Sequence, residues 1–544
     1  MSLRAYLLVS FLGLVLALGV AFFQSTPGYM DASYYMAGGV WLANGDGFNE
    51  RILWNYLDEP GGLPHPSHGY WMPLTSLLAA FTMLLSGAHT FTTARLGFLL
   101  LAAIIPMLTA RLSFALSGRR EWALLAGIIA AISGFYLPYL PTTDAFGLYM
   151  LFGALFFLVI HSQNSHSSQS LDESDQNHRL GHRKYVYVAP LILGGLAGLM
   201  HLTRADGILW LLVALLFNGS ELNRSPTGRR RMMSWLAAAL LVLIGYFMVM
   251  GPWLLRNLAV FDSFLSPGGG HALWITSYDE LFTYPASLLT PEHWWGSGLS
   301  AILKARLWAL GLNMQTLLAV QCQIFLLPLI ISGLWRLRHS RAVQAGLLAW
   351  ALTFLAMTLV FPYQGARGGF FHSGAALQPL FWAVTPVGLF AFLEWGERRR
   401  GWDTHQASRV FQIGMVLIAL FLTVFVTFNR VIGGDVLQPA WDDLQRRYAR
   451  VEQELIFRHA SPEAVVLVND APTYYLASRR PSISIPYGNT DVLLQVAQRY
   501  GGRYLLIEIE QVRGDTLYAQ PGDRPGLRYL ETVEGIRLYE IVAP

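Results

Sequence analysis

The stretch TPGYMDASYYMAGGVWLANGDGFNERILWNYLDEPGGLPHPSHGYW, residues 26–71, lies between two apolar runs and differs sharply from both. We call it the acidic loop, because it holds five acidic residues in a chain that is only 13% charged. It begins with a predicted amphipathic helix at a membrane surface, in which Asp31 occupies the first turn, where the helix dipole favours a carboxylate. The apolar face of that helix follows the i, i+3, i+4, i+7 spacing and consists of Tyr34, Tyr35, Gly38, Trp41 and Leu42. We expect this loop to carry the chemistry of the protein.

The sequence on either side of the acidic loop is typical of a membrane protein. Hydrophobic residues make up 54% of the chain. Runs of about 20 apolar residues recur from Leu3 to Phe428, and each is long enough to span ~30 Å of hydrocarbon as a helix. The first run, 3–23, exceeds the usual signal-peptide core and lacks a clear cleavage site, so we expect a retained helix. The fold class is therefore a polytopic α-helical membrane protein.

The distribution of basic residues sets the order of the crossings. The segment 72–86 is short for a crossing and begins beside a proline, and we place it along the membrane surface. The cytoplasmic segments then carry eighteen Lys and Arg residues, against eight in the outer segments up to Arg430, as the positive-inside rule requires. The eleven expected crossings are 3–23, 91–112, 121–140, 145–161, 185–203, 205–218, 234–255, 307–335, 342–361, 376–395 and 410–429.

This register divides the chain into a membrane domain, 1–430, and an outer domain, 431–544. Within the first, the polar tract 161–184 has no periodicity and is expected to be a disordered cytoplasmic linker. The outer domain is expected to be a small α/β unit that begins with a charged helix at 435–458 and ends in a hairpin turning at Glu534-Gly535. Its other predicted elements are strands at 464–468, 482–485 and 504–509 and a helix at 491–500.

Composition also excludes some classes of protein and site. The single cysteine, Cys322, rules out an internal disulfide and a multi-cysteine metal site. The net charge of +4 reflects arginine-rich loops, so no nucleic-acid partner is inferred.

Ionisable residues gather at the outer face beside the acidic loop. Arginine on this side runs against the positive-inside trend, and three such arginines favour an anion-binding site. Simpler explanations exist for some of them: Asp144 can cap the next helix, and Arg204 can pair with Asp206 as a salt bridge worth ~0–1 kcal/mol. The candidates outside the acidic loop are Asp144, Arg204, Asp206, Arg256, Arg367 and His372.

Several of these segments, in this order and spacing, resemble the GT-C superfamily of glycosyltransferases, in particular the bacterial protein-mannosyltransferase and aminoarabinose-transferase type. The resemblance covers residues 1 to about 395. The matching motifs are MDASYY (30–35), LANGDGF (42–48), HPSHGYWMPL (65–74), PTTDAF (141–146), LTRADGILW (202–210) and PWLLRN (252–257).

The resemblance implies a GT-C fold of about eleven membrane helices with amphipathic helices in the first outer loop. It also implies an inverting glycosyltransferase that uses a polyprenyl-phosphate sugar at the outer face of a prokaryotic plasma membrane. The acceptor would be a lipid, a glycan or a protein. In that scheme Asp31 is the catalytic base, and Asp144, Tyr34 and Tyr35 bind the acceptor. The expected donor-phosphate residues are Arg204, Arg256, His65, Arg367 and His372.

The sequence departs from the family pattern at two positions. Ala32 follows Asp31 where the family commonly has an Asp-Glu pair, which argues against a two-carboxylate metal site at that point, so no cofactor is assigned and a divalent cation is left open. His65 stands where some members have lysine, so its charge depends on its local pKa. The alternative function is a transporter or flippase of a lipid-linked or anionic substrate, although such proteins place ionisable groups near the bilayer midplane.

Overall fold

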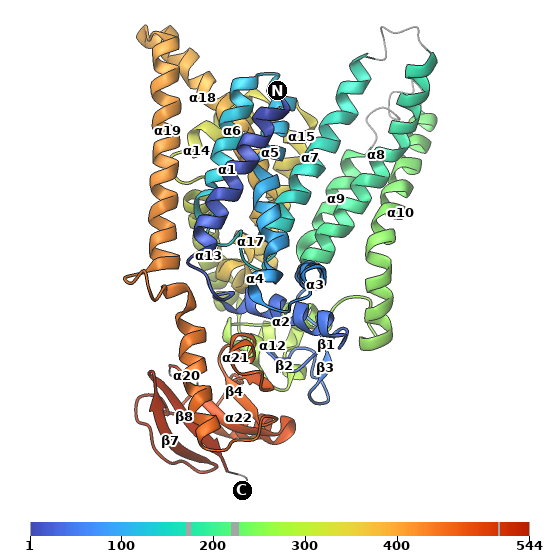
Figure 1. Ribbon diagram of the computed structural model, residues 1–544. Coiled ribbons are helices and arrows are strands. Elements are labelled where there is room, and N and C mark those ends of the chain that lie inside the picture. Colours follow the sequence, from blue (N-terminus) through green and yellow to red (C-terminus); the bar gives the residue numbers. More distant parts are fainter. Residues whose placement is uncertain (1, 170–175, 219–227, 510–511, 543–544) are drawn as a thin grey trace.

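The computed structural model describes residues 2–169, 176–218, 228–509 and 512–542. Long helices form a bundle, and a smaller domain built on a β-sheet lies against one end of it (Figure 1). We call this the domain end of the bundle. Helices α2 (Met30–Asn44) and α3 (Leu74–Ser86) lie there (Figure 1). The predicted fold class, a helical membrane protein with a small C-terminal α/β domain, is confirmed.

Each predicted crossing coincides with a helix or a pair of helices. Seven of the described helices are long and apolar enough to cross a membrane, and shorter apolar helices coincide with three more of the crossings. The register of eleven stays a prediction. The helices at these positions are α1 (Leu3–Ala21), α4 (Phe91–Ala94) with α5 (Leu96–Ser117), α6 (Arg120–Ile132), α7 (Phe146–Gln169), α8 (Gln176–Thr203), α9 (Ile208–Phe217), α10 (Gly228–Phe261), α13 (Leu299–Gln315) with α14 (Leu327–Arg336), α15 (Arg341–Leu355), α18 (Gln378–Arg400) and α19 (Thr404–Thr427).

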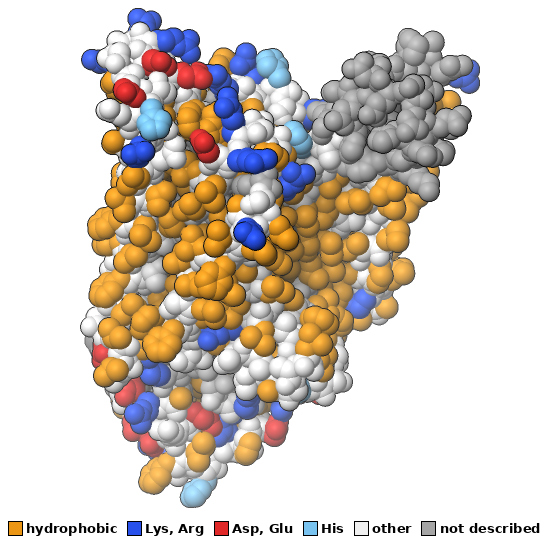
Figure 2. Space-filling model, turned by 45° about the horizontal axis from the view of Figure 1, so that its top comes forward, with side chains coloured by type: hydrophobic (Ala, Val, Ile, Leu, Met, Phe, Trp, Pro, Cys, Tyr) orange, Lys and Arg blue, Asp and Glu red, His pale blue; other side chains and the backbone are white. Residues whose placement is uncertain are grey.

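The outside of the bundle is apolar. Figure 2 shows hydrophobic side chains covering its middle, with most charged side chains gathered towards the two ends. Large apolar residues such as Phe11 of α1 and Phe421 of α19 are 64% and 67% exposed. An exposed apolar surface of this extent is stable only against lipid. The chain is a multi-pass membrane protein.

Two predicted segments differ from the structure. The crossing 307–335 is broken, because α13 runs into a π-helical turn, η6 (Thr316–Gln321), and α14 begins only at Leu327. Gln323 and Ile324 have φ of 45° and 59°, a left-handed conformation that cannot continue an α-helix. In the tract 161–184, the described backbone at 161–169 and 176–184 extends α7 and α8 rather than forming a disordered linker, and residues 170–175 lie outside the described residues. Extending an existing helix avoids the cost of nucleating one.

The smaller domain is built on a six-stranded sheet of order β2-β5-β4-β6-β8-β7. Strands β4 (Val465–Val468), β5 (Ser482–Ser484) and β6 (Gly502–Ile507) pair in parallel, and β7 (Leu527–Val533) and β8 (Ile536–Ile541) form the predicted hairpin. Its helices are α20 (Asp443–Phe457), α21 (Ala471–Ser478) and α22 (Thr490–Tyr500). The edge strand β2 (Ile52–Leu53) comes from the acidic loop and pairs with β5. The acidic loop therefore completes the sheet of the C-terminal domain.

The segments that connect the long helices at the domain end form short elements. Two strands of the acidic loop, β1 (Asn49–Glu50) and β3 (His65–Pro66), pair with each other. The remaining elements are η1 (Gly134–Tyr136), η2 (Ala205–Gly207), α11 (Pro267–His271), η4 (Asp279–Phe282), η5 (Ala286–Leu288), α12 (Pro291–Gly296), η7 (Ala356–Val360), α16 (Pro362–Gln364), η8 (Gly365–Gly369), α17 (Phe370–Gly374), η9 (Ala375–Leu377), η10 (Phe428–Ile432) and η11 (Ala440–Asp442).

Candidate active site

A cavity of about 340 Å³ opens at the domain end of the bundle. Its wall combines the start of α2, the end of the acidic loop, the turn between α8 and α9, and the segment from η7 to α17. Charged, polar and aromatic side chains line it together with apolar side chains of α9 and η7. The polar and aromatic lining residues are Asp31, Tyr35, Trp54, Tyr70, Trp71, Arg204, Asp206, Tyr278, Phe361, Gln364, Arg367 and His372.

Asp31 lies on the cavity wall because α2 begins at Met30, directly after Tyr29. Its side chain is 31% exposed. Burial raises the pKa of Asp31 to about 6; the nearby charge of Asp144 adds to this effect, while those of His372 and Arg204 oppose it. A carboxylate with such a pKa is still ionised at pH 7 and is a stronger base than an ordinary aspartate.

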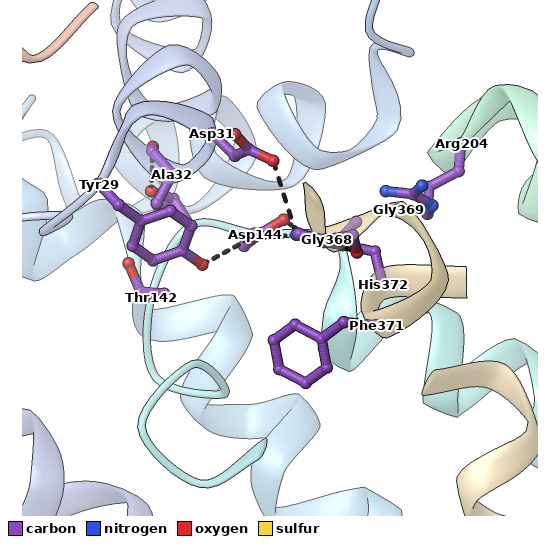
Figure 3. A network of polar contacts seen from close by, with 12 residues as sticks. Tyr29, Asp31, Ala32, Thr142, Asp144, Arg204, Gly368, Gly369, Phe371 and His372 are labelled. Atoms are coloured by element: carbon purple, nitrogen blue, oxygen red, sulfur yellow. Dashed lines mark hydrogen bonds and ion pairs between the residues drawn. The ribbon is translucent and has the colours of Figure 1, made fainter. Parts of the chain in front are cut away.

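Asp144 lies behind Asp31 and is almost completely buried, at 1% exposed. It precedes α7, and its Oδ1 accepts a hydrogen bond from the amide of Ala145 at 2.5 Å. Its Oδ2 accepts one from the hydroxyl of Tyr29 at 2.5 Å and lies 3.0 Å from Nε2 of His372 (Figure 3). Burial alone would raise the pKa of Asp144, but His372 and these hydrogen bonds together lower it below its usual range. Asp144 is therefore an ionised anchor.

His372 connects the two aspartates. It belongs to α17, and its Nε2 lies 3.6 Å from Oδ2 of Asp31 as well as beside Asp144 (Figure 3). Its Nδ1 lies 2.9 Å from the carbonyl oxygen of Gly368, which can only accept, so Nδ1 carries a hydrogen. Burial acts to lower the pKa of His372, but the two carboxylates outweigh it and raise the pKa above its usual range. The imidazole stacks on Phe146 at 4.2 Å.

These three residues form a set that can hold a metal ion. One ligand atom from each of Asp31, Asp144 and His372 lies within 4.8 Å of the others. The bond from Nδ1 of His372 to Gly368 leaves Nε2 facing the carboxylates, as in histidines that ligate metals. The sequence argued against a second carboxylate next to Asp31. The structure supplies one from Asp144, so the donor set fits a divalent cation.

Two arginines border the same cavity. Arg204 donates from Nε to Oδ1 of Asp206 at 2.9 Å, and Tyr149 donates to the other oxygen of Asp206 at 3.1 Å. Arg367 lies over the ring of Tyr278 at 5.1 Å and makes no ion pair among the described residues. One guanidinium is therefore fixed by a carboxylate, and the other is available to an anionic ligand.

Comparison with solved structures identifies the fold. AglB from Archaeoglobus fulgidus, an archaeal oligosaccharyltransferase captured with an inhibitory peptide and a dolichol-phosphate, matches with a TM-score of 0.56 at 13% identity, over 94% of this chain and 71% of its own. ArnT from Cupriavidus metallidurans bound to undecaprenyl phosphate matches with a TM-score of 0.54 at 11% identity, over 98% of both chains. Both are GT-C glycosyltransferases. The chain has the GT-C fold.

At these identities the likeness establishes the GT-C fold alone. No protein-family model matches the chain, and no curated protein matches it by sequence. A second AglB structure, a complex with Zn and sulfate, matches with a TM-score of 0.54 at 12% identity, over 93% of this chain and 70% of its own. The activity of this chain therefore has to be inferred from the residues that line its own cavity.

The GT-C fold brings five of the nine predicted site residues to the cavity and leaves a sixth directly behind it. Asp31, Tyr35, Arg204, Arg367 and His372 line the wall, and Asp144 touches His372 from the protein side. Asp144 is too deeply buried to contact an acceptor directly. Its position supports Asp31 and His372 instead.

The other three predicted site residues lie away from the cavity and hold the acidic loop together. The guanidinium of Arg256 donates to the carbonyl of Ser67 at 2.9 Å and lies over the ring of Trp253 at 4.7 Å. His65 is buried against the carbonyl of Ile52 at 2.8 Å. The hydroxyl of Tyr34 accepts from the amide of His68 at 2.9 Å. These contacts occupy their side chains, and none of the three lines the cavity.

The structure places several residues at the site that were not among the predicted site residues. Tyr29 donates to Asp144, and Tyr278 and Gln364 line the cavity. Tyr29 could have been found from its place beside Asp31. Tyr278 directly precedes η4 and Gln364 ends the short helix α16, and no sequence signal marks either residue.

Proposed function

We propose that this protein is an inverting glycosyltransferase that moves a sugar from a polyprenyl-phosphate donor to a hydroxyl acceptor. The observation that carries the proposal is a carboxylate with a raised pKa, Asp31, in a cavity at the domain end that also presents Arg204 and Arg367. That pairing supplies a proton acceptor and an anion site within one pocket. The polyprenyl phosphates in the AglB and ArnT structures support a donor of this class.

The donor is expected to lie with its phosphate at the two arginines. Arg367 is the freer of the two, and Arg204 is held in place by Asp206. The apolar part of the cavity wall, which includes Leu209 of α9 and Met357 of η7, suits the first isoprene units of a lipid tail. The sugar would then lie towards the aromatic part of the wall.

The reaction follows from this placement. The acceptor oxygen attacks the anomeric carbon, and Asp31 takes the hydroxyl proton as the new bond forms. The bond between the anomeric carbon and the phosphate oxygen breaks, and its electron pair leaves on the phosphate beside Arg204 and Arg367. General-base help contributes ~10²–10⁴ in rate, and fixed donors on a developing anion contribute ~2.7–4 kcal/mol each. Attack from the face opposite the phosphate inverts the anomeric centre.

His372 and Asp144 keep Asp31 in its orientation. The Asp144 carboxylate fixes the imidazole, and the imidazole holds the Asp31 oxygen at 3.6 Å. A divalent cation held by these three side chains would supply positive charge beside the acceptor. One AglB structure is a complex with Zn and sulfate, which supports a divalent cation in a protein of this fold.

The proposed location is the outer face of a prokaryotic plasma membrane. The cavity and the C-terminal domain share one end of the bundle, and the arginine-rich loops are assigned to the opposite, cytoplasmic side. The transferred sugar is a hexose or a pentose, and the acceptor is a lipid, a glycan or a protein.

Incubation of the purified protein with a panel of polyprenyl-phosphate sugars tests the proposal. We expect at least one donor to be consumed, with release of polyprenyl phosphate and inversion at the anomeric carbon. Consumption should be lost in Asp31→Asn. A parallel series with chelator and with added Mg²⁺, Mn²⁺ or Zn²⁺ decides whether a cation is required. If no donor is consumed and the reconstituted protein instead carries a lipid-linked or anionic solute across vesicles, the transporter alternative replaces this proposal.

A further inference from the structure

The segment that joins α19 to the C-terminal domain packs against the turn that leads into α2. Within η11, the carboxylate of Asp442 accepts hydrogen bonds from the amides of Ser25 and Thr26, at 3.1 and 2.9 Å, and from the Thr26 hydroxyl at 2.7 Å. Trp441 donates from its indole nitrogen to the carbonyl of Thr26 at 3.1 Å. Both η11 side chains are buried, at 4% and 7% exposed. The tail thus satisfies the backbone of the turn before Asp31.

Trp441 also reaches the hydrogen-bond network of the site. Its indole packs edge-on against the ring of Tyr29 at 5.7 Å, and Tyr139 packs on the same ring at 5.6 Å. Tyr29 is the residue whose hydroxyl donates to Asp144. At Gly28, φ is +89° and a Cβ would lie 2.1 Å from the indole nitrogen, so the close approach needs glycine. The contact therefore fixes the N-terminal end of α2.

The C-terminal domain holds α2 at two further points. The hydroxyl of Thr473 in α21 donates to the hydroxyl of Ser33 at 2.9 Å. The indole of Trp41 donates to the hydroxyl of Tyr475 at 2.8 Å. Together with the pairing of β2 and β5, these contacts connect both ends of α2 to the tail of the chain.

We infer that Trp441 and Asp442 are positioning residues for catalysis, which act by fixing the turn before α2 so that Asp31 faces His372 and Asp144. The inference rests on the proposed function and assigns to the C-terminal segment a role in the transfer step. A contact that serves folding alone would change the amount and stability of the protein but not its turnover per folded molecule.

The test compares Trp441→Ala, Trp441→Phe and Asp442→Ala in purified protein. In Trp441→Ala and Asp442→Ala we expect kcat to fall by about 10²-fold, the loss that a displacement of ~1 Å can cause, with donor KM within about threefold of wild type. Trp441→Phe keeps the ring against Tyr29 and should recover most of the lost kcat. Hydrogen–deuterium exchange of a peptide spanning 24–36 should be faster in both alanine variants.

The matched control is Asp443→Ala, one residue further along. The Asp443 side chain is 57% exposed and, among the described residues, forms an ion pair only with Arg446 of its own helix, so kcat and exchange at 24–36 should equal wild type. Faster exchange at 24–36 in the alanine variants with unchanged kcat would overturn the inference, as would an equal loss of kcat in Asp443→Ala. Unaltered exchange at 24–36 would overturn it as well.

The two arms separate this inference from the proposed function. If the wild-type protein consumes no polyprenyl-phosphate donor, the proposed function fails, and the positioning role in catalysis fails with it. The exchange experiment would still decide whether the tail fixes α2. If the wild-type protein is active and the alanine variants do not differ from it in kcat, the proposed function stands and the positioning inference alone is wrong.

Discussion

Asp31 is the residue on which the proposed chemistry depends, and Asp31→Asn tests it directly. Asparagine keeps the shape of the side chain but cannot accept the hydroxyl proton. We expect the transfer rate to fall by about 10²-fold or more while donor binding persists, measured as kcat and as donor Kd in the purified variant. Asp46→Asn, at the exposed end of α2, is the control and should keep wild-type turnover. If Asp31→Asn transfers sugar at a near-normal rate, Asp31 is not the catalytic base and another group accepts the proton.

Arg367 and Arg256 are expected to separate donor binding from stability. Arg367 lines the cavity without an ion pair among the described residues, so Arg367→Ala should raise donor KM by about tenfold or more, the loss of one charge-assisted contact of ~1.5–3 kcal/mol. Its thermal midpoint should not change. Arg256→Ala removes the contacts to Ser67 and Trp253 and should lower the midpoint, with a donor KM near wild type.

Thermal midpoints and donor KM measured on both variants check this pair. A raised KM in Arg256→Ala at unchanged stability would restore its assignment to the donor site. Unchanged KM in Arg367→Ala would place the phosphate elsewhere in the cavity.

At the level of single residues, the sequence can show which side chains are unusual but not what they contact. Asp31 and Arg204 were predicted because charged residues are uncommon beside the apolar runs on the outer side and therefore indicate a functional role. Both line the cavity. Arg256 gives the same signal for a different reason, because its guanidinium stacks on Trp253 of its own helix, α10, and donates to Ser67 of the acidic loop. His65 likewise looks like a ligand in sequence and is a buried contact of Ile52. Only the fold separates these cases.

The helix α21 begins with a buried aspartate whose titration should be visible in stability. The side chain of Asp470 caps α21 by accepting from the amide of Thr473 at 3.0 Å. Burial raises the pKa of Asp470 to about 7, above the ~3.9 of an unfolded chain. Between these values the folded protein keeps a proton that the unfolded chain releases, so stability falls as pH rises through this window, and the loss is complete above about pH 7.

Asp470→Asn keeps an oxygen for the cap and has no charge to bury. We expect its melting temperature to exceed that of wild type at pH 8 by at least about 4 °C, the shift that ~1 kcal/mol gives in a domain of this size. At pH 3 the two proteins should melt together, because Asp470 is then protonated in the folded state and largely so in the unfolded chain. If the two melting temperatures differ equally at every pH, or do not differ at pH 8, then ionisation of Asp470 does not destabilise the folded domain.

At the level of elements, hydropathy was enough to locate the helices but not their interruptions. Long apolar runs predicted the helices because a helix is the simplest structure that satisfies its backbone inside lipid. The break after α13 has no glycine to mark it, since Gln323 and Ile324 adopt the left-handed conformation there. The polar tract 161–184 looked disordered by composition, yet the described backbone at its two ends continues α7 and α8.

The whole molecule assembles its site from segments that are far apart in the chain. Asp31, Asp144 and His372 come from three separate elements, and α2 itself is held by residues of the C-terminal tail. The pairing of β2 with β5 rests on two residues of the acidic loop, too few to predict from a strand pattern. Such long-range contacts depend on the packed bundle and leave no periodicity in the sequence.

The arrangement of the bundle predicts which parts of the chain lie on each side of the membrane. The exposed loop between α14 and α15, which contains His339, lies at the end rich in arginine, and the C-terminal domain lies at the other. We expect His339→Cys to be protected from a membrane-impermeant thiol reagent in intact cells and to react after lysis. Thr516→Cys, in an exposed part of the C-terminal domain, should react in both.

The single native cysteine, Cys322, is buried and should give little background labelling in this experiment. The unmodified protein is the control for that background, and labelling after lysis shows that each introduced thiol is accessible. Equal labelling of both variants in intact cells would contradict the eleven-crossing register. An even number of crossings between His339 and Thr516 would then be required, and the cavity would lose its assignment to the side where polyprenyl-phosphate sugars are presented. Reaction of Thr516→Cys alone would instead place Asp31, Arg204 and Arg367 at the outer surface, as the proposed transfer requires.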